Sequence, residues 1–273
     1  MRNRRRTRSR DPIRPSLVRS VDHALALLDL LADGTGSWGI SECARATGLS
    51  KAAVFRLVRT LERHGYVAQT DGRRYVLGAR PLELAGVVLR RFEVREVARP
   101  TMLALAERTG ESVVLTAPGR DGVICLDTVD SPQRIRASFQ IGRITPWHAG
   151  AAGKLHLAFL PEGRIREILA RGLPRYTERT ITDPAALRRD LARIRRQGYA
   201  FTVGEFDPGV AAITAPIRDS RSEVVAALSI GGPAARFSAD ALPALIRHVR
   251  EAAEEVSMRL LGGRRPVGQA RPA

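Results

Sequence analysis

Residues 40–76 constrain the fold of this chain most strongly, because two short helical patterns and a hairpin turn follow one another there. The second helix is predicted to begin at Ser50, whose hydroxyl can accept a free backbone amide, and to end before Gly65, which suits a left-handed cap. A shorter helix over residues 41–48 precedes it and is joined to it by Leu49. This spacing is typical of a helix-turn-helix unit.

The second helix is predicted to have two chemically different faces. Apolar residues recur at helical spacing and indicate a face packed against a core, namely Val54, Leu57, Val58 and Leu61. Small and cationic residues gather on the opposite face, namely Ala52, Arg56, Arg59 and Arg63, with Lys51 in the first turn and Phe55 on the flank. A charged helix face is most often only a solvated surface. The face alone therefore leaves solvent exposure and a bound partner both open.

A two-stranded wing is predicted after this helix. Residues 66–69 and 73–77 flank Thr70, Asp71 and Gly72, and Asp-Gly is a strong hairpin signal. Upstream, residues 20–31 form a first helix whose expected core face is Val21, Leu25, Leu28 and Leu31. The wing arginines would flank the same groove as the cationic face, so the unit is predicted to bind double-stranded DNA through phosphates or base edges. The predicted contacts are Ser50, Lys51, Ala52, Phe55, Arg56, Arg59, Arg73 and Arg74.

The net charge of +17, with a sequence pI near 11.4, also favours a polyanionic partner. Arginine-rich usage can equally reflect genome composition. The basic arm, residues 1–18, is predicted to be disordered, and it either tracks phosphates or is a solvated tail. No apolar stretch follows the arm, and no run approaches the ~20 apolar residues needed to span a bilayer. We therefore expect no export, no membrane partner and a cytoplasmic location.

The rest of the chain predicts a second domain of mixed helices and a mainly antiparallel sheet. Residues 79–91 carry an apolar stripe of Leu82, Ala85, Val88 and Leu89, which favours a linker helix that pairs two subunits. Strands are predicted at residues 112–116, 122–127, 134–139, 199–205, 211–217 and 224–231. Helices are predicted at residues 94–109, 151–159, 163–170, 185–197 and 239–261.

No catalytic motif emerges, so the chain is predicted not to be an enzyme. Glu205 and Asp207 are close carboxylates, but the following Pro208 and Gly209 favour a polar turn over acid/base catalysis. Cys43 and Cys125 are expected to be buried small hydrophobes, and the five histidines lack the spacing of metal ligands. We expect no metal and no cofactor.

Motifs spread over nearly the whole chain resemble the IclR family of bacterial transcriptional regulators. In the first domain these are residues 19–28 (RSVDHALALL), 48–51 (GLSK), 56–57 (RL), 61–66 (LERHGY) and 75–78 (YVLG). In the second they are 142–146 (GRITP), 148–149 (HA), 152–154 (AGK), 157–158 (LA), 160–161 (LP), 198–200 (GYA), Glu205, 208–210 (PGV), 215–216 (AP) and 227–230 (ALSI). The resemblance implies an α+β chain with an N-terminal winged helix-turn-helix, a linker helix and a C-terminal GAF-like domain that binds a small effector. It also implies homodimers or dimers of dimers.

The resemblance further implies where an effector binds. Gly150 and Ala151 would offer backbone amides and Glu205 a polar wall. Ala212, Ser229 and Gly231 would form the floor, and Trp147 would line the mouth. Ordinary core or loop packing is the alternative for each. At positions 150, 212 and 231 this chain lacks the hydroxyl or thiol that relatives often carry, so a small hydroxy or keto acid is less secure and a larger or more aromatic ligand becomes plausible.

The sequence thus predicts five segments: a basic arm (1–18), a DNA-binding domain (19–78), a linker (79–91), an effector domain (92–262) and a disordered tail (263–273). The predicted function is that of a sequence-specific DNA-binding regulator, a repressor in preference to an activator. A small metabolite, such as an organic or aromatic acid, would modulate its DNA binding. Two alternatives stay open: a metabolic enzyme with an accessory DNA-binding-like domain, and a nonspecific nucleic-acid-coating protein.

Overall fold

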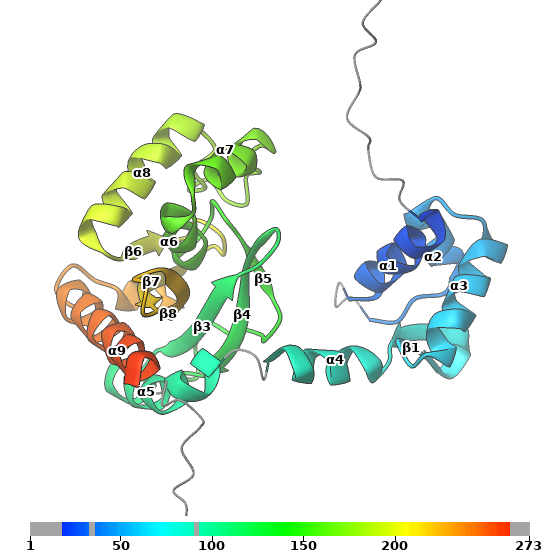
Figure 1. The fold of residues 1–273 in the computed structure, drawn as a ribbon, viewed down its shortest axis with the longest axis horizontal. Helices are drawn as coiled ribbons and strands as arrows, with labels where there is room; N and C mark the ends of the chain where they lie inside the picture. Colours follow the sequence, from blue (N-terminus) through cyan, green and yellow to red (C-terminus); the bar gives the residue numbers. More distant parts are fainter. Residues whose placement is uncertain (1–17, 33–35, 90–92, 263–273) are drawn as a thin grey trace, which may run out of the picture. The chain divides into compact units, whose positions relative to one another are not determined.

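The computed structural model describes residues 18–32, 36–89 and 93–262 (Figure 1). The chain divides into two units, residues 1–88 and residues 89–273, here called the N-terminal and C-terminal units. The predicted basic arm, except Val18, and the predicted tail at 263–273 lie outside the described residues. In the part of the chain that is described, no helix is both long enough and apolar enough to cross a membrane.

The N-terminal unit has the predicted helices and wing. In chain order these are α1 (Arg19–Leu31), α2 (Ile40–Thr47), α3 (Lys51–Arg63), β1 (Val67–Thr70) and β2 (Arg74–Leu77), followed by α4 (Arg80–Leu89). Strands β1 and β2 pair antiparallel, and a short 3-10 turn over Asp71–Arg73 joins them. Trp38 adds a bridge to Tyr75 of β2, which ties the wing to the segment before α2.

Local capping sets the limits of the helix-turn-helix pair. The Ser50 hydroxyl accepts a hydrogen bond from the Ala53 amide at 3.2 Å, so α3 begins where the sequence predicts. The chain leaves α2 and α3 at Gly48 and Gly65, whose φ angles of 72° and 74° lie in the left-handed region that glycine tolerates best. The turn between the two helices therefore follows from short-range chemistry.

The core face of α1 differs from the prediction. Leu27 and Leu31 are buried, whereas Val21 and Leu25 are each 55% exposed. The helix carries two apolar stripes, and α2, α3 and the wing cover the one that includes Leu27. Periodicity alone could not separate the two stripes, since both recur at helical spacing.

The C-terminal unit is a six-stranded antiparallel sheet between two helical layers (Figure 1). Its strands are β3 (Ser112–Pro118), β4 (Gly122–Val129), β5 (Ile144–Pro146), β6 (Ala200–Val203), β7 (Val210–Arg218) and β8 (Val224–Pro233), in the order β5-β4-β3-β8-β7-β6. Its helices are α5 (Glu93–Thr109), α6 (Ala151–Phe159), α7 (Glu162–Ala170), α8 (Pro184–Gln197) and α9 (Leu242–Gly262). The predicted mixture of helices and antiparallel sheet is confirmed.

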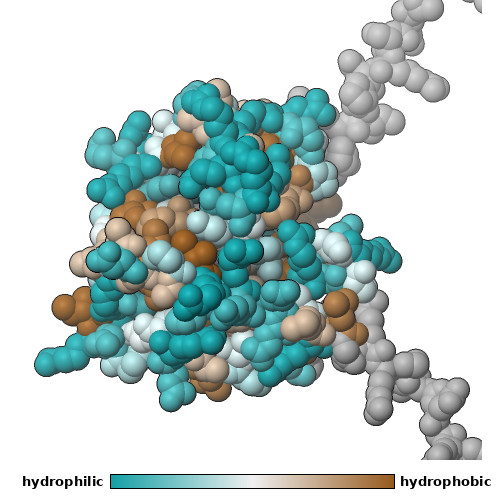
Figure 2. Space-filling model, turned by 90° about the vertical axis from the view of Figure 1, so that its left-hand side faces the viewer, coloured by the Kyte–Doolittle hydropathy of each residue, from teal (hydrophilic) through white to brown (hydrophobic). Residues whose placement is uncertain are grey.

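Each face of this sheet has its own apolar core. Helices α5 and α9 pack on one face, where the predicted α5 stripe that includes Ala98, Met102 and Leu105 is fully buried. Helices α6, α7 and α8 form the other layer. Along β8, Leu228 and Ile230 belong to the first core and Ala227 to the second, as expected from side chains that alternate across a strand. Figure 2 shows mainly hydrophilic residues on the outside, with apolar ones in small groups.

The strand predicted at residues 134–139 is wrong. Residues 131–143 run as bends and irregular chain, and the third strand along this stretch is the short β5. The reason lies in how the backbone carbonyls are used: the Ser112 hydroxyl donates to the Ala137 carbonyl and the Arg236 guanidinium donates to the Ile135 carbonyl. These acceptors are therefore satisfied without a strand ladder.

Candidate functional site

Helix α3 exposes the cationic face that its sequence predicts. Val54 and Val58 are fully buried, while Arg56 and Arg59 on the opposite side are exposed and Phe55 is 51% exposed. Arg59 also forms an i,i+3 ion pair with Glu62 at 2.7 Å, although its side chain is 58% exposed. An exposed pair of this kind is weak and can be exchanged for a phosphate. The face is therefore open to a polyanion.

The other predicted contacts on α3 lie on or beside this face. Lys51 and Ala52 are exposed in the first turn, where a small side chain lets a partner approach the backbone closely. Ser50 is also exposed, but its hydroxyl already caps the helix by accepting the Ala53 amide. Its remaining capacity is to donate the hydroxyl proton to an outside acceptor.

The two wing arginines have different surroundings. Arg73 is exposed in the turn, with a positive φ of 59°. Arg74 instead donates to Glu42 Oε2 at 2.9 Å, to Ser37 Oγ at 2.9 Å and to the Ser37 carbonyl. The pKa of Glu42 lies below its ordinary value, first because it accepts the Gly39 amide and then because Arg74 faces it. Arg74 thus fastens the wing to the start of α2, a role that the sequence did not reveal.

The two arginines should therefore respond differently to truncation. Arg73→Ala should weaken DNA binding without changing the melting temperature of the N-terminal unit, because Arg73 is exposed. Arg74→Ala should lower that melting temperature, because Glu42 and Ser37 lose their partner. Circular dichroism melting and fluorescence anisotropy with duplex DNA measure the two effects. Equal melting temperatures for both variants would contradict the fastening role.

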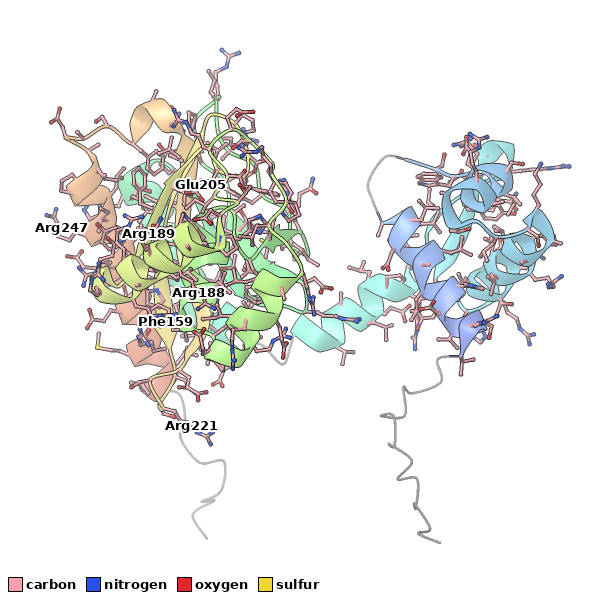
Figure 3. The ribbon with its side chains drawn as sticks, turned by 90° about the horizontal axis from the view of Figure 1, so that it is seen from above. Phe159, Arg188, Arg189, Glu205, Arg221 and Arg247 are labelled. Atoms are coloured by element: carbon pink, nitrogen blue, oxygen red, sulfur yellow. The ribbon has the colours of Figure 1, made fainter. Side chains whose placement is uncertain are left out.

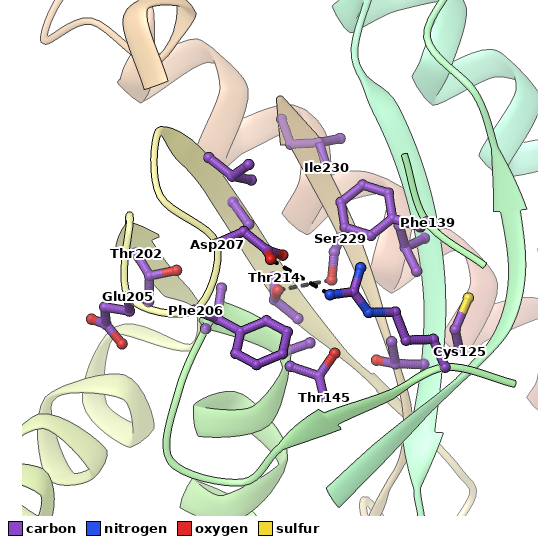
Figure 4. Close-up of a pocket in the computed structure, with 18 of the residues that line it drawn as sticks. Cys125, Phe139, Thr145, Thr202, Glu205, Phe206, Asp207, Thr214, Ser229 and Ile230 are labelled. Carbon is purple, nitrogen blue, oxygen red and sulfur yellow. Dashed lines mark hydrogen bonds and ion pairs between the residues drawn. The ribbon is translucent and has the colours of Figure 1, made fainter. Parts of the chain in front are cut away.

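A pocket opens in the C-terminal unit between the sheet and the N-terminus of α6 (Figure 4). Its volume is about 80 Å³. Its apolar lining comprises Val114, Cys125, Phe139, Ala151, Ala152, Phe206, Val210, Ala212 and Ile230, with Gly150 at the edge. Its polar lining comprises Thr116, Gln140, Arg143, Thr145, Thr202, Glu205, Asp207, Thr214 and Ser229. Segments far apart in the sequence therefore converge on one small, mixed surface.

The structure brings five of the seven predicted effector residues to this pocket. Gly150, Ala151, Glu205, Ala212 and Ser229 all line it. Trp147 does not, because its ring is 5% exposed and packs in the core of the α6–α8 layer. Gly231 lies next to the lining and packs against Phe139 instead.

Two of the positions that lack a polar side chain leave room for aromatic rings. A Cβ placed on Gly231 would lie 2.7 Å from Phe139 Cζ, which is closer than carbon atoms approach, so Phe139 occupies that space. A Cβ on Gly150 would lie 3.7 Å from Phe206 Cβ. Phe139 and Phe206 both line the pocket. Where relatives often carry polar side chains, this chain therefore has aromatic walls.

A buried ion cluster stands behind one wall. The Lys154 ammonium, on α6, lies 2.7 Å from Asp190 Oδ2 of α8 and 2.6 Å from Glu205 Oε1 of the β6–β7 loop, and its side chain is 1% exposed. Burial raises the pKa of Glu205, and the adjacent Lys154 opposes that rise by favouring the carboxylate. Figure 3 shows Glu205 in the C-terminal unit on the α8 side. Because Lys154 anchors it, Glu205 presents a fixed carboxylate to the pocket.

Sequence reasoning did not single out the basic and aromatic residues of the pocket. Arg143, just before β5, lies over the Phe206 ring at 5.4 Å from its centroid and 3.5 Å from Asp207 Oδ1. The available signal was the close pair Glu205 and Asp207, since two neighbouring carboxylates need a cation nearby. Arg143 stands within the 142–146 motif, but only the folded chain places it opposite Asp207.

His156 lies fully buried behind Thr116 of the pocket wall and should make stability depend on pH. Its Nε2 is 3.2 Å from Thr116 Oγ1, and burial lowers its pKa from 6.5 to about 4. Between these values the unfolded chain binds more protons, so stability should fall as pH drops from 6.5 towards 4, by about 3 kcal/mol. Urea unfolding across this range tests it. His156→Leu should show a slope flatter by that amount, and an unchanged slope would contradict it.

The two cysteines are free and buried, as predicted, and burial raises the pKa of the Cys125 thiol to about 11. That pKa keeps the thiol protonated and a poor nucleophile. Within the described ranges, no three His, Cys, Asp or Glu side chains are grouped to hold a metal ion.

Comparison with known proteins covers both units. The family model of the IclR helix-turn-helix domain matches residues 20–71, and that of the bacterial transcriptional regulator IclR C-terminal domain matches residues 86–258. The acetate operon repressor of Salmonella typhimurium is 33% identical over 251 residues, 90% of this chain and 92% of that protein. The glycerol operon regulatory protein of Streptomyces coelicolor is 36% identical over 250 residues, 90% of this chain and 98% of that protein.

A solved structure extends the likeness to three dimensions. An IclR homologue from Microbacterium hydrocarbonoxydans, crystallised with 4-hydroxybenzoate, superposes with a TM-score of 0.76 at 28% identity and covers 88% of this chain and 98% of that one. The two family models, the two regulators and this structure agree with the exposed cationic helix and the pocketed second unit. The chain belongs to the IclR family of bacterial transcriptional regulators.

Proposed function

We propose that this protein represses transcription by binding a specific DNA site, and that a small organic acid bound in the C-terminal unit changes its affinity for that site. The observation that carries the proposal is the exposed cationic face of α3, built on a capped helix-turn-helix with Arg56 and Arg59 outward and Val54 and Val58 buried. This face matches the dimensions and charge of a DNA major groove.

Two relatives support the direction and the ligand class. The Salmonella protein is named as a repressor, and the Microbacterium protein was crystallised with an aromatic hydroxy acid. The pocket of this chain, with its aromatic walls and polar side chains, is suited to a ligand of that general kind. The ligand acts as an effector only if it binds the DNA-bound and free states with different affinities.

We further propose that two copies of the chain pair through apolar residues on α1 and α4. These are Val18, Val21 and Leu25 on or just before α1, and Leu82, Leu84 and Val87 on α4, all between 40% and 76% exposed. A second copy is the fitting occupant, because a symmetric dimer presents two α3 helices to two half-sites. Homodimers, or dimers of dimers, follow from this pairing.

The pairing predicts a change in mass. The double variant Leu25→Lys and Leu82→Lys should lower the mass measured by multi-angle light scattering, because charges would replace buried apolar contacts. Leu103→Lys, at a 50% exposed position on α5, is the matched control and should keep the wild-type mass. A double variant that keeps the wild-type mass would rule out these two helices as the contact.

The protein would act as a binding switch and not as an enzyme, and it would work in the cytoplasm, where its DNA partner lies. Selection from a random pool of duplexes tests the proposal: repeated rounds should enrich one two-fold symmetric sequence. Organic acids should then shift the affinity of the full chain for that sequence. A pool that stays random after several rounds would contradict sequence-specific binding and favour a coating protein.

A further inference from the structure

The pocket contains one cation whose pairing is incomplete. Among its lining residues, Arg143 carries the only basic side chain. The guanidinium reaches Asp207 Oδ1 at 3.5 Å, at the outer limit of a hydrogen bond, and the structure gives it no other side-chain hydrogen bond in the described residues. A guanidinium has five N–H donors in a fork that fits a carboxylate. Arg143 is therefore free to accept an anionic group from a ligand.

The same pocket contains a buried acceptor without a donor. Glu205 Oε1 is held by Lys154 at 2.6 Å, but Glu205 Oε2 is buried and has no hydrogen-bond partner in the part of the chain that the structure describes. A buried polar atom left unpaired costs free energy. A ligand that donates a proton to Oε2 would remove this cost and would be selected over one that cannot.

The surface between these two groups is apolar and partly aromatic. Phe139 and Phe206 form walls, and the guanidinium of Arg143 lies over the Phe206 ring. Figure 4 shows Glu205 and Phe139 coming from different sides of the pocket, with Phe206 beside Asp207. A ligand that satisfies both polar groups must therefore have an apolar body that joins its two polar ends.

We propose that the effector is a hydroxy-carboxylate, with its carboxylate on the Arg143 guanidinium and its hydroxyl donating to Glu205 Oε2. This inference rests on the proposed function and adds to it the class of effector and the residues that select it. Arg143 determines selectivity for the anion, and Glu205 determines selectivity for the hydroxyl.

The charges of the pocket permit an anion to bind. Lys154 lies between Glu205 and the pocket interior's remaining acid neighbour, Asp190, and partly neutralises them. Asp207 is 44% exposed on its side chain, so it can turn to water when a ligand carboxylate takes its place on Arg143. The exchange replaces one long ion pair with a two-pronged one, which is the stronger geometry for arginine.

Isothermal titration of the full-length protein tests this assignment with five probes. They are 4-hydroxybenzoate, its 2- and 3-hydroxy isomers, benzoate and 4-hydroxybenzamide. The isomers vary the distance between the two polar ends, benzoate lacks the hydroxyl, and the amide lacks the negative charge. At least one hydroxybenzoate should bind about 10- to 100-fold more tightly than the amide and about tenfold more tightly than benzoate.

Two variants separate the two contacts. Arg143→Gln should bind the hydroxy acid and the amide equally, while it keeps the preference over benzoate. Glu205→Gln should lose the preference for the hydroxylated acid, while it keeps that for the acid over the amide. Arg120→Gln changes the net charge equally at a side chain that is 94% exposed, and it should keep both preferences.

The assignment is overturned if Arg143→Gln keeps the wild-type preference for acid over amide, or if none of the five probes binds. The proposed function fails by a different result, the absence of a specific DNA site. A protein that binds its DNA site and ignores all five probes would leave the repressor intact and reject only the hydroxy-carboxylate.

Discussion

Arg56→Glu is expected to weaken specific DNA binding by about 1000-fold, or about 4 kcal/mol. Loss of an arginine contact to a base costs about 1–3 kcal/mol, and a carboxylate facing phosphates adds repulsion. Arg56 is exposed at the centre of the cationic face, and no side-chain contact restrains it among the residues described. Fluorescence anisotropy with the selected duplex, at fixed salt, measures the effect.

Two companion variants show what kind of contact is lost. Arg56→Ala should cost about 1–3 kcal/mol and relax the sequence preference if Arg56 reads a base, but it should reduce the salt dependence by about one ion on every sequence if Arg56 holds a phosphate. Arg250→Ala, at an exposed position of α9, is the control for net charge and should bind as the wild type does. If Arg56→Glu binds at full strength, α3 is not the recognition helix.

Lys154→Met is expected to lower the free energy of unfolding of the C-terminal unit by about 3–5 kcal/mol. The substitution removes the partner shared by Glu205 and Asp190, so two carboxylates are left in a partly buried site. The chain has two tryptophans, so in a Trp38→Phe background Trp147 reports on the C-terminal unit alone. Urea unfolding followed by Trp147 fluorescence measures the loss.

The pH dependence of this variant has a definite sign. Without Lys154, the pKa of Glu205 should rise further, so the folded state binds more protons than the unfolded chain. The stability deficit should then shrink as pH falls from 7 towards 5. Adding Glu205→Gln to Lys154→Met should recover part of the loss at pH 7. A loss below about 1 kcal/mol with no pH dependence would show that the cluster contributes little.

Short-range chemistry explains why the DNA-binding unit could be predicted so closely. The Ser50 cap, the glycines after α2 and α3, and the Asp-Gly turn act within a few residues, so the sequence states them directly. The buried stripe of α5 follows from the same logic, since every fourth residue faces one side. These elements would form the same local pattern in any fold.

The failures come from contacts between distant segments. The choice between the two apolar stripes of α1 depends on where α2 and α3 pack. The irregular chain at 134–139 depends on Ser112 and Arg236, which lie far away in sequence. Arg74 pairs with Glu42 across 32 positions, so periodicity could not show that it fastens the wing.

The pocket was predicted only in part for the same reason. Glu205, Ala212 and Ser229 were expected from family resemblance, and they do line it. Arg143 and Phe139 reach it because an irregular loop folds over the sheet, and Phe139 fits because position 231 is glycine. Specificity in this chain therefore lies in the residues that pattern and resemblance leave unassigned.

Footprinting of the full-length protein over the chromosome of its own organism tests the central claim most directly. The account predicts one or a few protected sites, each with two-fold symmetry, that are lost with Arg56→Glu and shift in occupancy when an effector acid is added. Uniform coverage that follows salt concentration alone, or protected sites that survive Arg56→Glu unchanged, would contradict it.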